Sequence, residues 1–151
     1  MSRRLLPIVA CSSREASGSV SVPPVPNLAA IGIVTRDMSE SVRFYRTLGI
    51  EVPDPDGDHL DTTLPNGLRL MWDNVELIKQ LNTLWVEPHG HGMALAFECA
   101  SPDEVDETYK RIVGAGFRAG REPWDAFWGQ RYAWVYDPDN NQVDLFAALE
   151  R

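Results

Sequence analysis

The stretch that decides the fold is "AAIGIVTRDMSESVRFYRTLGIEV", residues 29–52, because a variant of it, "MALAFECASPDEVDETYKRIVGAGFRA", recurs at residues 93–119. Each copy has the pattern of a strand, a helix start, an amphipathic helix and a glycine exit. A shift of 64 residues aligns Ala30 with Ala94 and Tyr45 with Tyr109. The repeat therefore predicts two copies of one structural unit.

The helix starts are the strongest part of the repeat. Asp37 precedes Glu40 by three residues, and Ser101 precedes Glu104 by three, so both have the spacing of a capping box. Pro102 follows Ser101 at the first helical position, where a missing N–H costs nothing. Apolar residues then recur at helical spacing in both copies: Met38, Val42, Tyr45 and Leu48 in the first, and Val105, Tyr109, Ile112 and Val113 in the second.

Strand-type segments follow each predicted helix. They are "DTTL" and "LRLMWD" in the first copy, and "RYAWVYD" and "QVDLFAAL" in the second, joined by the turns "PNG" and "DPDNN". The second turn resembles the start of a calcium loop but lacks its later glycine and glutamate, so we interpret it as structural. The predicted class is α+β, with two tandem βαβββ modules over residues 27–90 and 91–151 of a single domain.

Composition narrows the partner class. The chain has 151 residues, 44% apolar, with a net charge of −8. Nucleic acid and anionic membranes both need a basic face, so we expect neither as a partner. The two cysteines form neither a disulfide framework nor a zinc motif, which favours a cytoplasmic protein.

The first 26 residues are rich in serine, proline and small residues and predict a disordered tail. An alternative is export, because "MSRRLLPIVAC" resembles a bacterial lipoprotein signal. Its apolar run is shorter than the usual length of about 7–15 residues and contains a proline, which disfavours that interpretation. No segment has the length and apolarity of a transmembrane helix.

The repeat resembles the vicinal oxygen chelate superfamily, which holds glyoxalases, extradiol dioxygenases and bleomycin resistance proteins. The resemblance covers about residues 27–149, and its specific parts are "RDMSESVRFYRTLGIEV" and "FWGQRYAWVYDPDNNQVDLF". It implies that the two modules curl a mixed sheet into a cup, with the helices on its outer face. Pairing into homodimers is common in the family, and we expect it here, since open strand edges need a cover.

The metal-dependent members place four ligands in the cup, a histidine on the first strand of each module and a carboxylate on the last. By resemblance these positions hold Ala30, Arg69, Ala94 and Asp144 here. A divalent site needs about three protein ligands and excludes a guanidinium, so we predict no metal, no cofactor and no catalytic residue. Three histidines lie in loop-type sequence and offer no substitute set: His59, His89 and His91.

Strand alternation divides the side chains between a face under the helices and a face lining the cup. The cup floor then has small residues and its walls are aromatic, which is typical of a site for a flat organic ligand. For Tyr132 and Trp134, plain core packing is the alternative. The predicted ligand-binding residues are Arg69, Met71, Glu98, Trp124, Phe127, Trp128, Tyr132, Trp134 and Asp144, with Trp124, Phe127 and Trp128 on a rim loop.

Asp144 lies inside an apolar strand, and an unpaired buried carboxylate is costly. We predict that it pairs with Arg69 across the cup or faces a bound cation or amide. The alternative is a partly solvated carboxylate at the cup mouth. Residues 72–88 exceed what a hairpin needs, and their spacing predicts a short helix or lid between the modules.

The sequence thus favours a metal-free homodimer that sequesters a flat aromatic or hydrophobic compound such as an antibiotic. An enzyme of the same fold, a metal-dependent glyoxalase-like lyase or isomerase or a dioxygenase, is the alternative. A subunit that only binds another protein is a third, and it predicts no ligand-sized cup.

Overall fold

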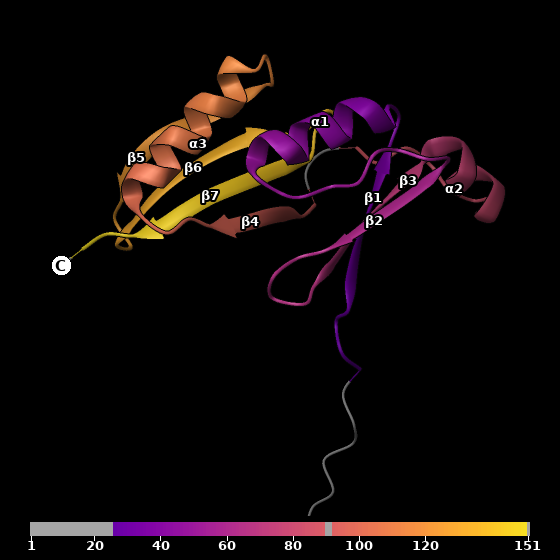
Figure 1. The fold of residues 1–151 in the computed structure, drawn as a ribbon, viewed down its shortest axis with the longest axis horizontal. Coiled ribbons are helices and arrows are strands. Elements are labelled where there is room, and N and C mark those ends of the chain that lie inside the picture. Colours follow the sequence, from indigo (N-terminus) through magenta and orange to yellow (C-terminus); the bar gives the residue numbers. More distant parts are fainter. Residues whose placement is uncertain (1–25, 90–91, 151) are drawn as a thin grey trace, which may run out of the picture.

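A computed structural model describes residues 26–89 and 92–150 of the chain. In each module its elements begin with a strand followed by a helix, as expected from the repeat (Figure 1). They are β1 (Ala30–Thr35), α1 (Met38–Leu48), β2 (His59–Thr63), β3 (Arg69–Asn74), α2 (Val75–Leu81), β4 (Ala94–Glu98), α3 (Pro102–Gly114), β5 (Ala119–Ala126), β6 (Gln130–Tyr136) and β7 (Gln142–Ala148). The predicted α+β class is confirmed. The predicted tail lies almost wholly outside the described residues.

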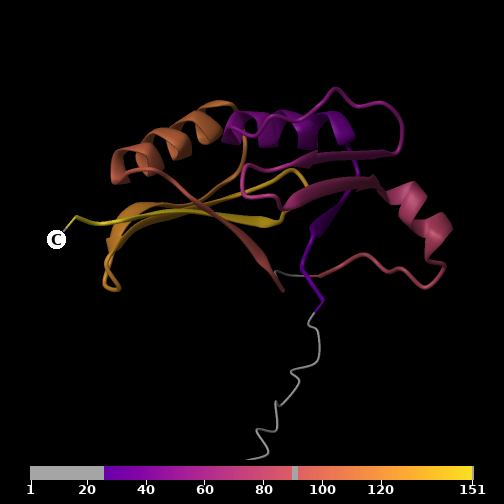
Figure 2. The same cartoon turned by 60° about the horizontal axis from the view of Figure 1, so that its bottom comes forward.

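The strands form two mixed sheets. The first has the order β1-β3-β2 and the second the order β4-β7-β6-β5. In both, the first strand of the module lies parallel to the last strand, and the remaining neighbours are antiparallel. The two modules therefore share this pattern of strand pairing, as the repeat predicts. Helices α1 and α3 lie on the same side of the two sheets (Figure 2).

The first module differs from the prediction, because two strands follow its helix instead of three. Residues 49–58, between α1 and the start of β2, form no strand. This segment contains Pro53 and Pro55, which cannot donate to a ladder, and the turn formers of "DPDGD". The corresponding segment of the second module forms β5.

Strand β5 corrects a second expectation, since "REPWDAFWGQ" was predicted to be a rim loop. Its first part belongs to the strand Ala119–Ala126, which pairs with β6 through two register shifts. Pro123 obscures the strand in the sequence, yet β5 is an edge strand, where a proline is tolerated. Trp124 is thereby fixed on a sheet instead of a loop.

Both helices begin as predicted, and their caps differ in one detail. The Asp37 carboxylate accepts a hydrogen bond from the Glu40 N–H at 3.0 Å, and the Ser101 hydroxyl accepts one from the Glu104 N–H at 3.2 Å. The Glu104 side chain reaches back to the N–H of Ala100, whereas Glu40 pairs with Arg43 instead. The first capping box is thus half formed.

One hydrophobic cluster includes side chains from both modules. At its centre, Tyr45 of α1 donates a hydrogen bond to the Asp137 carboxylate, in the turn between β6 and β7, at 2.8 Å. The same carboxylate accepts the backbone N–H groups of Asp139 and Asn141 at 3.0 and 2.7 Å. The "DPDNN" turn is therefore structural, as predicted, and joins the modules. Burial raises the pKa of Asp137 despite these donors.

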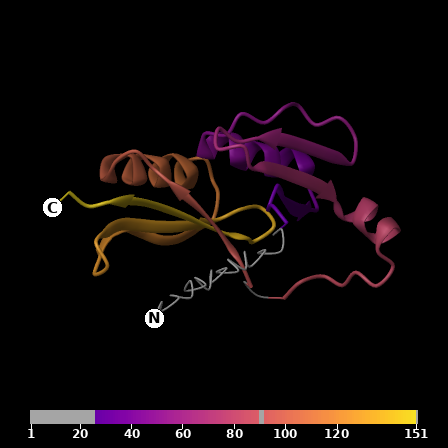
Figure 3. The same cartoon turned by 90° about the horizontal axis from the view of Figure 1, so that it is seen from below.

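The segment between the modules contains α2, which confirms the predicted short helix. It contacts β1 and β3 at the end of the first sheet that is remote from α3 (Figure 3). None of its residues is buried. Within the described residues, no helix has the length and apolarity needed to cross a bilayer.

The predicted cup is not a single continuous sheet. Strands β1 and β4 are both edge strands, and no ladder joins them within the described residues. A groove of about 980 Å³ runs between the modules, lined by β4 and by Ile31, Ile50 and Leu64 among others. The modules are held together on the helix side, where Arg111 of α3 donates to the Thr47 carbonyl at 2.9 Å.

Candidate functional site

The faces of the second sheet are those that strand alternation predicts. Ala133 and Val135 of β6 are fully buried under α3, whereas Tyr132 and Trp134, which alternate with them, are partly exposed on the opposite face. In β7, Phe146 lies opposite Tyr132 in the ladder and shares that face. The side of the second sheet away from the helices is therefore aromatic.

Five rings on this side form a continuous set of contacts, which we call the aromatic face: Trp124, Trp128, Tyr132, Trp134 and Phe146. The Trp124 ring lies 5.5 to 6.0 Å from those of Trp128, Tyr132 and Trp134, always edge to face. Tyr132 stacks on Phe146 at 6.2 Å. Edge-to-face contacts of this kind hold the rings in a fixed arrangement.

Two residues that the sequence did not single out shape the aromatic face. The Arg121 guanidinium lies 3.6 Å from the centre of the Trp124 ring, a cation–π contact. Gly120 leaves room for Trp134. A Cβ at this position would lie 2.6 Å from the Trp134 carbonyl oxygen and would overlap the indole ring. Both belong to β5, the strand that sequence patterns missed.

Asp144 has partners within its own sheet. It accepts hydrogen bonds from the Tyr132 hydroxyl at 2.6 Å and from the Gln142 side-chain amide at 2.8 Å, and it is 8% exposed. Burial raises the pKa of Tyr132 to about 12, and the carboxylate of Asp144 adds to the shift. Asp144 thus lies on the same face of the sheet and holds the Tyr132 side chain in place.

The predicted pairing of Asp144 with Arg69 is wrong. The Arg69 guanidinium lies in the first sheet, 3.5 Å from the Asp61 carboxylate, and half of its side chain is exposed. Register explains the error. Ala30 lies opposite Arg69 in one ladder and Ala94 lies opposite Gln142 in the other, so Gln142, not Asp144, is the counterpart of Arg69. The counterpart of Asp144 is Met71.

The other predicted site residues divide between the two sheets. Met71 lies beside Arg69, whose guanidinium donates to its sulfur at 3.4 Å. Glu98 is exposed and lines the groove between the modules. Phe127, at the turn after β5, is 96% exposed and packs edge-on against Trp128. Six of the nine predicted residues thus lie on the aromatic face or touch it, namely Trp124, Phe127, Trp128, Tyr132, Trp134 and Asp144.

The donors at the positions implied by the family do not fit a divalent metal. Two of the four positions hold alanine, which has no ligand atom. On the last strands, the residues opposite these alanines are Arg69 and Gln142, and the next residues on the same face are Met71 and Asp144. Neither pair supplies more than one anionic ligand. Across the described residues, no group of three or more histidine, cysteine or acidic side chains is placed to hold a metal. His59 is engaged with Asp73 at 2.6 Å.

Comparison with known proteins agrees with this architecture. The model of the Glyoxalase/Bleomycin resistance protein/Dioxygenase superfamily matches residues 27–145. The chain belongs to this superfamily. No curated protein matches significantly. The family resemblance of the repeat is therefore confirmed at the level of the superfamily.

Solved structures of the superfamily share the fold. A glyoxalase/bleomycin resistance protein/dioxygenase from Nocardioides is 29% identical, with a TM-score of 0.70 over 87% of this chain and 89% of that one. A family enzyme from Burkholderia phytofirmans is 18% identical, with a TM-score of 0.74 over 82% of this chain and all of the other. A glyoxalase-related enzyme from Fulvimarina pelagi is 23% identical, with a TM-score of 0.72, and covers 82% and 88%.

Proposed function

We propose that this protein binds a flat aromatic or hydrophobic compound without a metal and sequesters it, in the manner of a resistance protein. The observation that supports the proposal best is the aromatic face. Its rings are fixed by one another, yet Trp128 is still 49% exposed. Large apolar side chains left accessible in a fixed arrangement are a common feature of binding sites.

The chemistry of the face indicates the shape of the ligand. Indole rings offer broad stacking surfaces. The Arg121 guanidinium lies over Trp124 and can orient a polar or anionic edge of the ligand. Asp144 is engaged by Tyr132 and Gln142 and is nearly buried, so its role is to position Tyr132. A planar compound with an apolar body and one polar edge matches this arrangement.

The aromatic face is one wall and needs a second. Phe127 and Trp128 project at the turn between β5 and β6, and Phe127 is 96% exposed. The open edges of β1 and β4 also need a cover. A second copy of the chain would supply both, so the proposed binding form is a homodimer.

Tryptophan fluorescence tests the proposal. Polycyclic compounds of the intercalating-antibiotic type should quench it saturably, with micromolar or tighter affinity. Trp128→Ala should weaken binding by about 1 kcal/mol or more, because it removes a stacking surface. Trp85→Ala, on the linker after α2, is the matched control and should leave the affinity unchanged.

Two results would contradict the proposal. One is the absence of saturable quenching by any compound of the panel. The other is about one equivalent of divalent metal after purification without a histidine tag, lost on Asp144→Asn, which would favour the metal-dependent enzyme of the same fold.

A further inference from the structure

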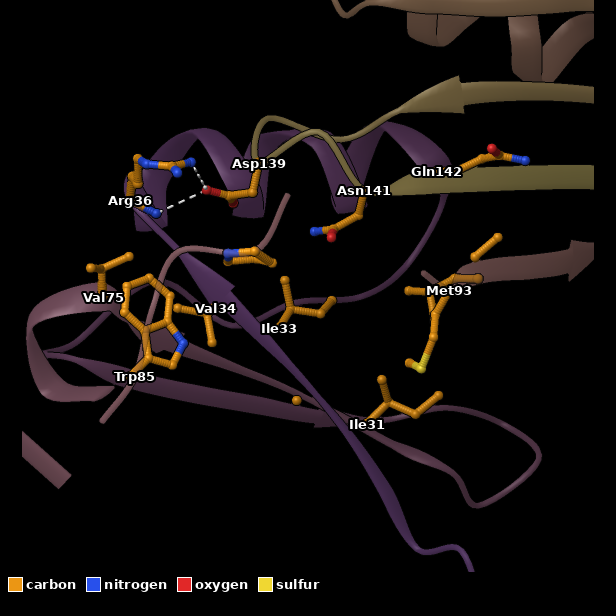
Figure 4. A pocket seen from close by; sticks show the side chains of 14 residues that line it. Ile31, Ile33, Val34, Arg36, Val75, Trp85, Met93, Asp139, Asn141 and Gln142 are labelled. Atoms are coloured by element: carbon orange, nitrogen blue, oxygen red, sulfur yellow. Dashed lines mark hydrogen bonds and ion pairs between the residues drawn. The ribbon is translucent and has the colours of Figure 1, made fainter. Parts of the chain in front are cut away.

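A separate pocket of about 250 Å³ lies between the two modules at the end of β1 (Figure 4). Strand β1, the linker after α2, the start of β4 and the turn before β7 enclose it. Most of its wall is apolar and includes Ile31, Val34, Val75, Trp85 and Met93. The pocket lies just below the range of about 300–1,000 Å³ that is typical of ligand sites, so it suits a small molecule.

One end of the pocket is polar, and Asp139 forms it. The Asp139 side chain is only 7% exposed. Its Oδ1 accepts the backbone N–H of Arg36 at 2.9 Å, while its buried Oδ2 has no hydrogen-bond partner among the described residues. A buried carboxylate oxygen without a donor is costly, so this end of the pocket favours a ligand that brings positive charge or N–H donors.

The charged side chains around this end of the pocket also favour a positively charged ligand. Arg36 supplies positive charge, but it is shared between Glu87 and Asp139, whose Oδ1 is 3.8 Å from the guanidinium. Two carboxylates therefore face one guanidinium. Asn141 points into the pocket in Figure 4. Its amide nitrogen donates to Asp137 at 2.9 Å, which leaves its oxygen as a further acceptor. Acceptors and negative charge exceed donors and positive charge.

We propose that this pocket binds a small organic amine with an aromatic or branched apolar body. The ammonium group lies at Asp139 and Asn141, and the apolar body lies against Val34, Val75 and Trp85. The pocket shares no lining residue with the aromatic face, so the proposal is independent of the proposed function. A ligand carboxylate would compete with Glu87 and Asp139 for Arg36 and would be repelled.

Calorimetry with three probes of similar shape tests the proposal. 2-Phenylethylamine should bind saturably, and 2-phenylethanol and 3-phenylpropionate should bind at least tenfold more weakly, because they lack the positive charge. Equal affinity for the three probes, tighter binding of the carboxylate, or no saturable heat from the amine would each overturn the proposal.

Variants then locate the amine. Asp139→Asn keeps an oxygen that can accept the Arg36 N–H and removes only the charge, so it should weaken amine binding at least tenfold. Asp125→Asn, an exposed carboxylate on β5, is the matched control and should leave it unchanged. Val34→Phe should block binding by filling the pocket. Thermal unfolding checks that each variant is folded.

The proposals for the two sites can be tested independently of each other. A saturating amine should not displace a polycyclic quencher from the aromatic face. Amine binding that survives Asp139→Asn and Val34→Phe but is lost in Trp128→Ala would place the amine on the aromatic face and overturn the second site.

Discussion

At the residue scale, Asp144 shows how a carboxylate can remain inside an apolar strand. Its sequence position suggested a metal ligand or an ion pair, yet its partners are a phenol and an amide of the same sheet. Neutral donors satisfy the carboxylate oxygens without a second buried charge. The carboxylate in turn fixes the Tyr132 ring within the aromatic face.

The hydrogen bond between Tyr132 and Asp144 should be detectable in the titration of the Tyr132 hydroxyl. The pKa of Tyr132 is raised to about 12, first by burial and then by Asp144. Asp144→Asn should lower the pKa but leave it above the ordinary value of about 10, since the effect of burial remains. The tyrosinate absorbance of the variant should rise at lower pH than that of the wild type, and Tyr132→Phe identifies the signal.

The raised pKa of Tyr132 also makes the stability of the protein depend on pH. Between about pH 10 and 12 the unfolded Tyr132 loses its proton before the folded one does, so the free energy of unfolding falls as pH rises through this window. Asp125→Asn, which removes a carboxylate paired with Arg131, is the control. An unchanged titration in Asp144→Asn would show that the contact is absent in solution.

At the scale of the elements, β5 connects the fold to the candidate site. It carries Trp124 and Arg121, and its glycine admits the Trp134 side chain from the neighbouring strand. Its proline is tolerated because the strand lies at the edge of the sheet. The equivalent segment of the first module has no strand, and among the described residues the aromatic face belongs to the second sheet.

Gly120→Ala tests this packing. The added methyl group would overlap the Trp134 side chain and approach its carbonyl oxygen, so we expect a loss of about 1–3 kcal/mol in the free energy of unfolding. Denaturant titration measures this loss, and near-ultraviolet circular dichroism should report a disturbed tryptophan environment.

The matched control for this variant is Gly114→Ala. Gly114 is the last residue of α3 and has open space around it, so alanine there should be neutral or slightly stabilising. A Gly120→Ala protein as stable as wild type would mean that β5 lies farther from β6 than the structure has it.

At the scale of the whole molecule, the modules are joined on one side and open on the other. Tyr45 and Asp137 connect them within the core, and Arg43 of α1 donates to the carbonyl of Ala115 after α3 at 2.9 Å. On the other side, no strand among the described residues pairs with the outer edges of β1 and β4, which lie beside a groove. Exposed edges of this kind are usually paired or covered in soluble proteins.

We therefore predict a homodimer in solution. Light scattering at micromolar concentration and moderate salt should give the mass of two chains, because twofold pairing is the commonest way to cover such surfaces. The mass should fall toward that of one chain only on strong dilution. The mass of a single chain throughout the concentration range would contradict the dimer and leave the aromatic face with one wall.

The sequence by itself determined the features that depend on local patterns. Capping residues and apolar spacing located α1 and α3, period-two alternation assigned Tyr132 and Trp134 to the open face, and the repeat predicted the shared pattern of strand pairing. These signals are reliable because a helix cap or a strand face is decided by residues a few positions apart.

Only the tertiary structure decided what depends on distant partners. A shift of two residues in register separates Asp144 from the counterpart of Arg69, and no local pattern records which strand lies opposite. Strand β5 can form despite its proline because it lies at an edge, and the edge position follows from the order of the whole sheet. Cross-strand hydrogen bonds fix register and edges, so the partners of Asp144 and the place of Trp124 emerge only when the chain is folded.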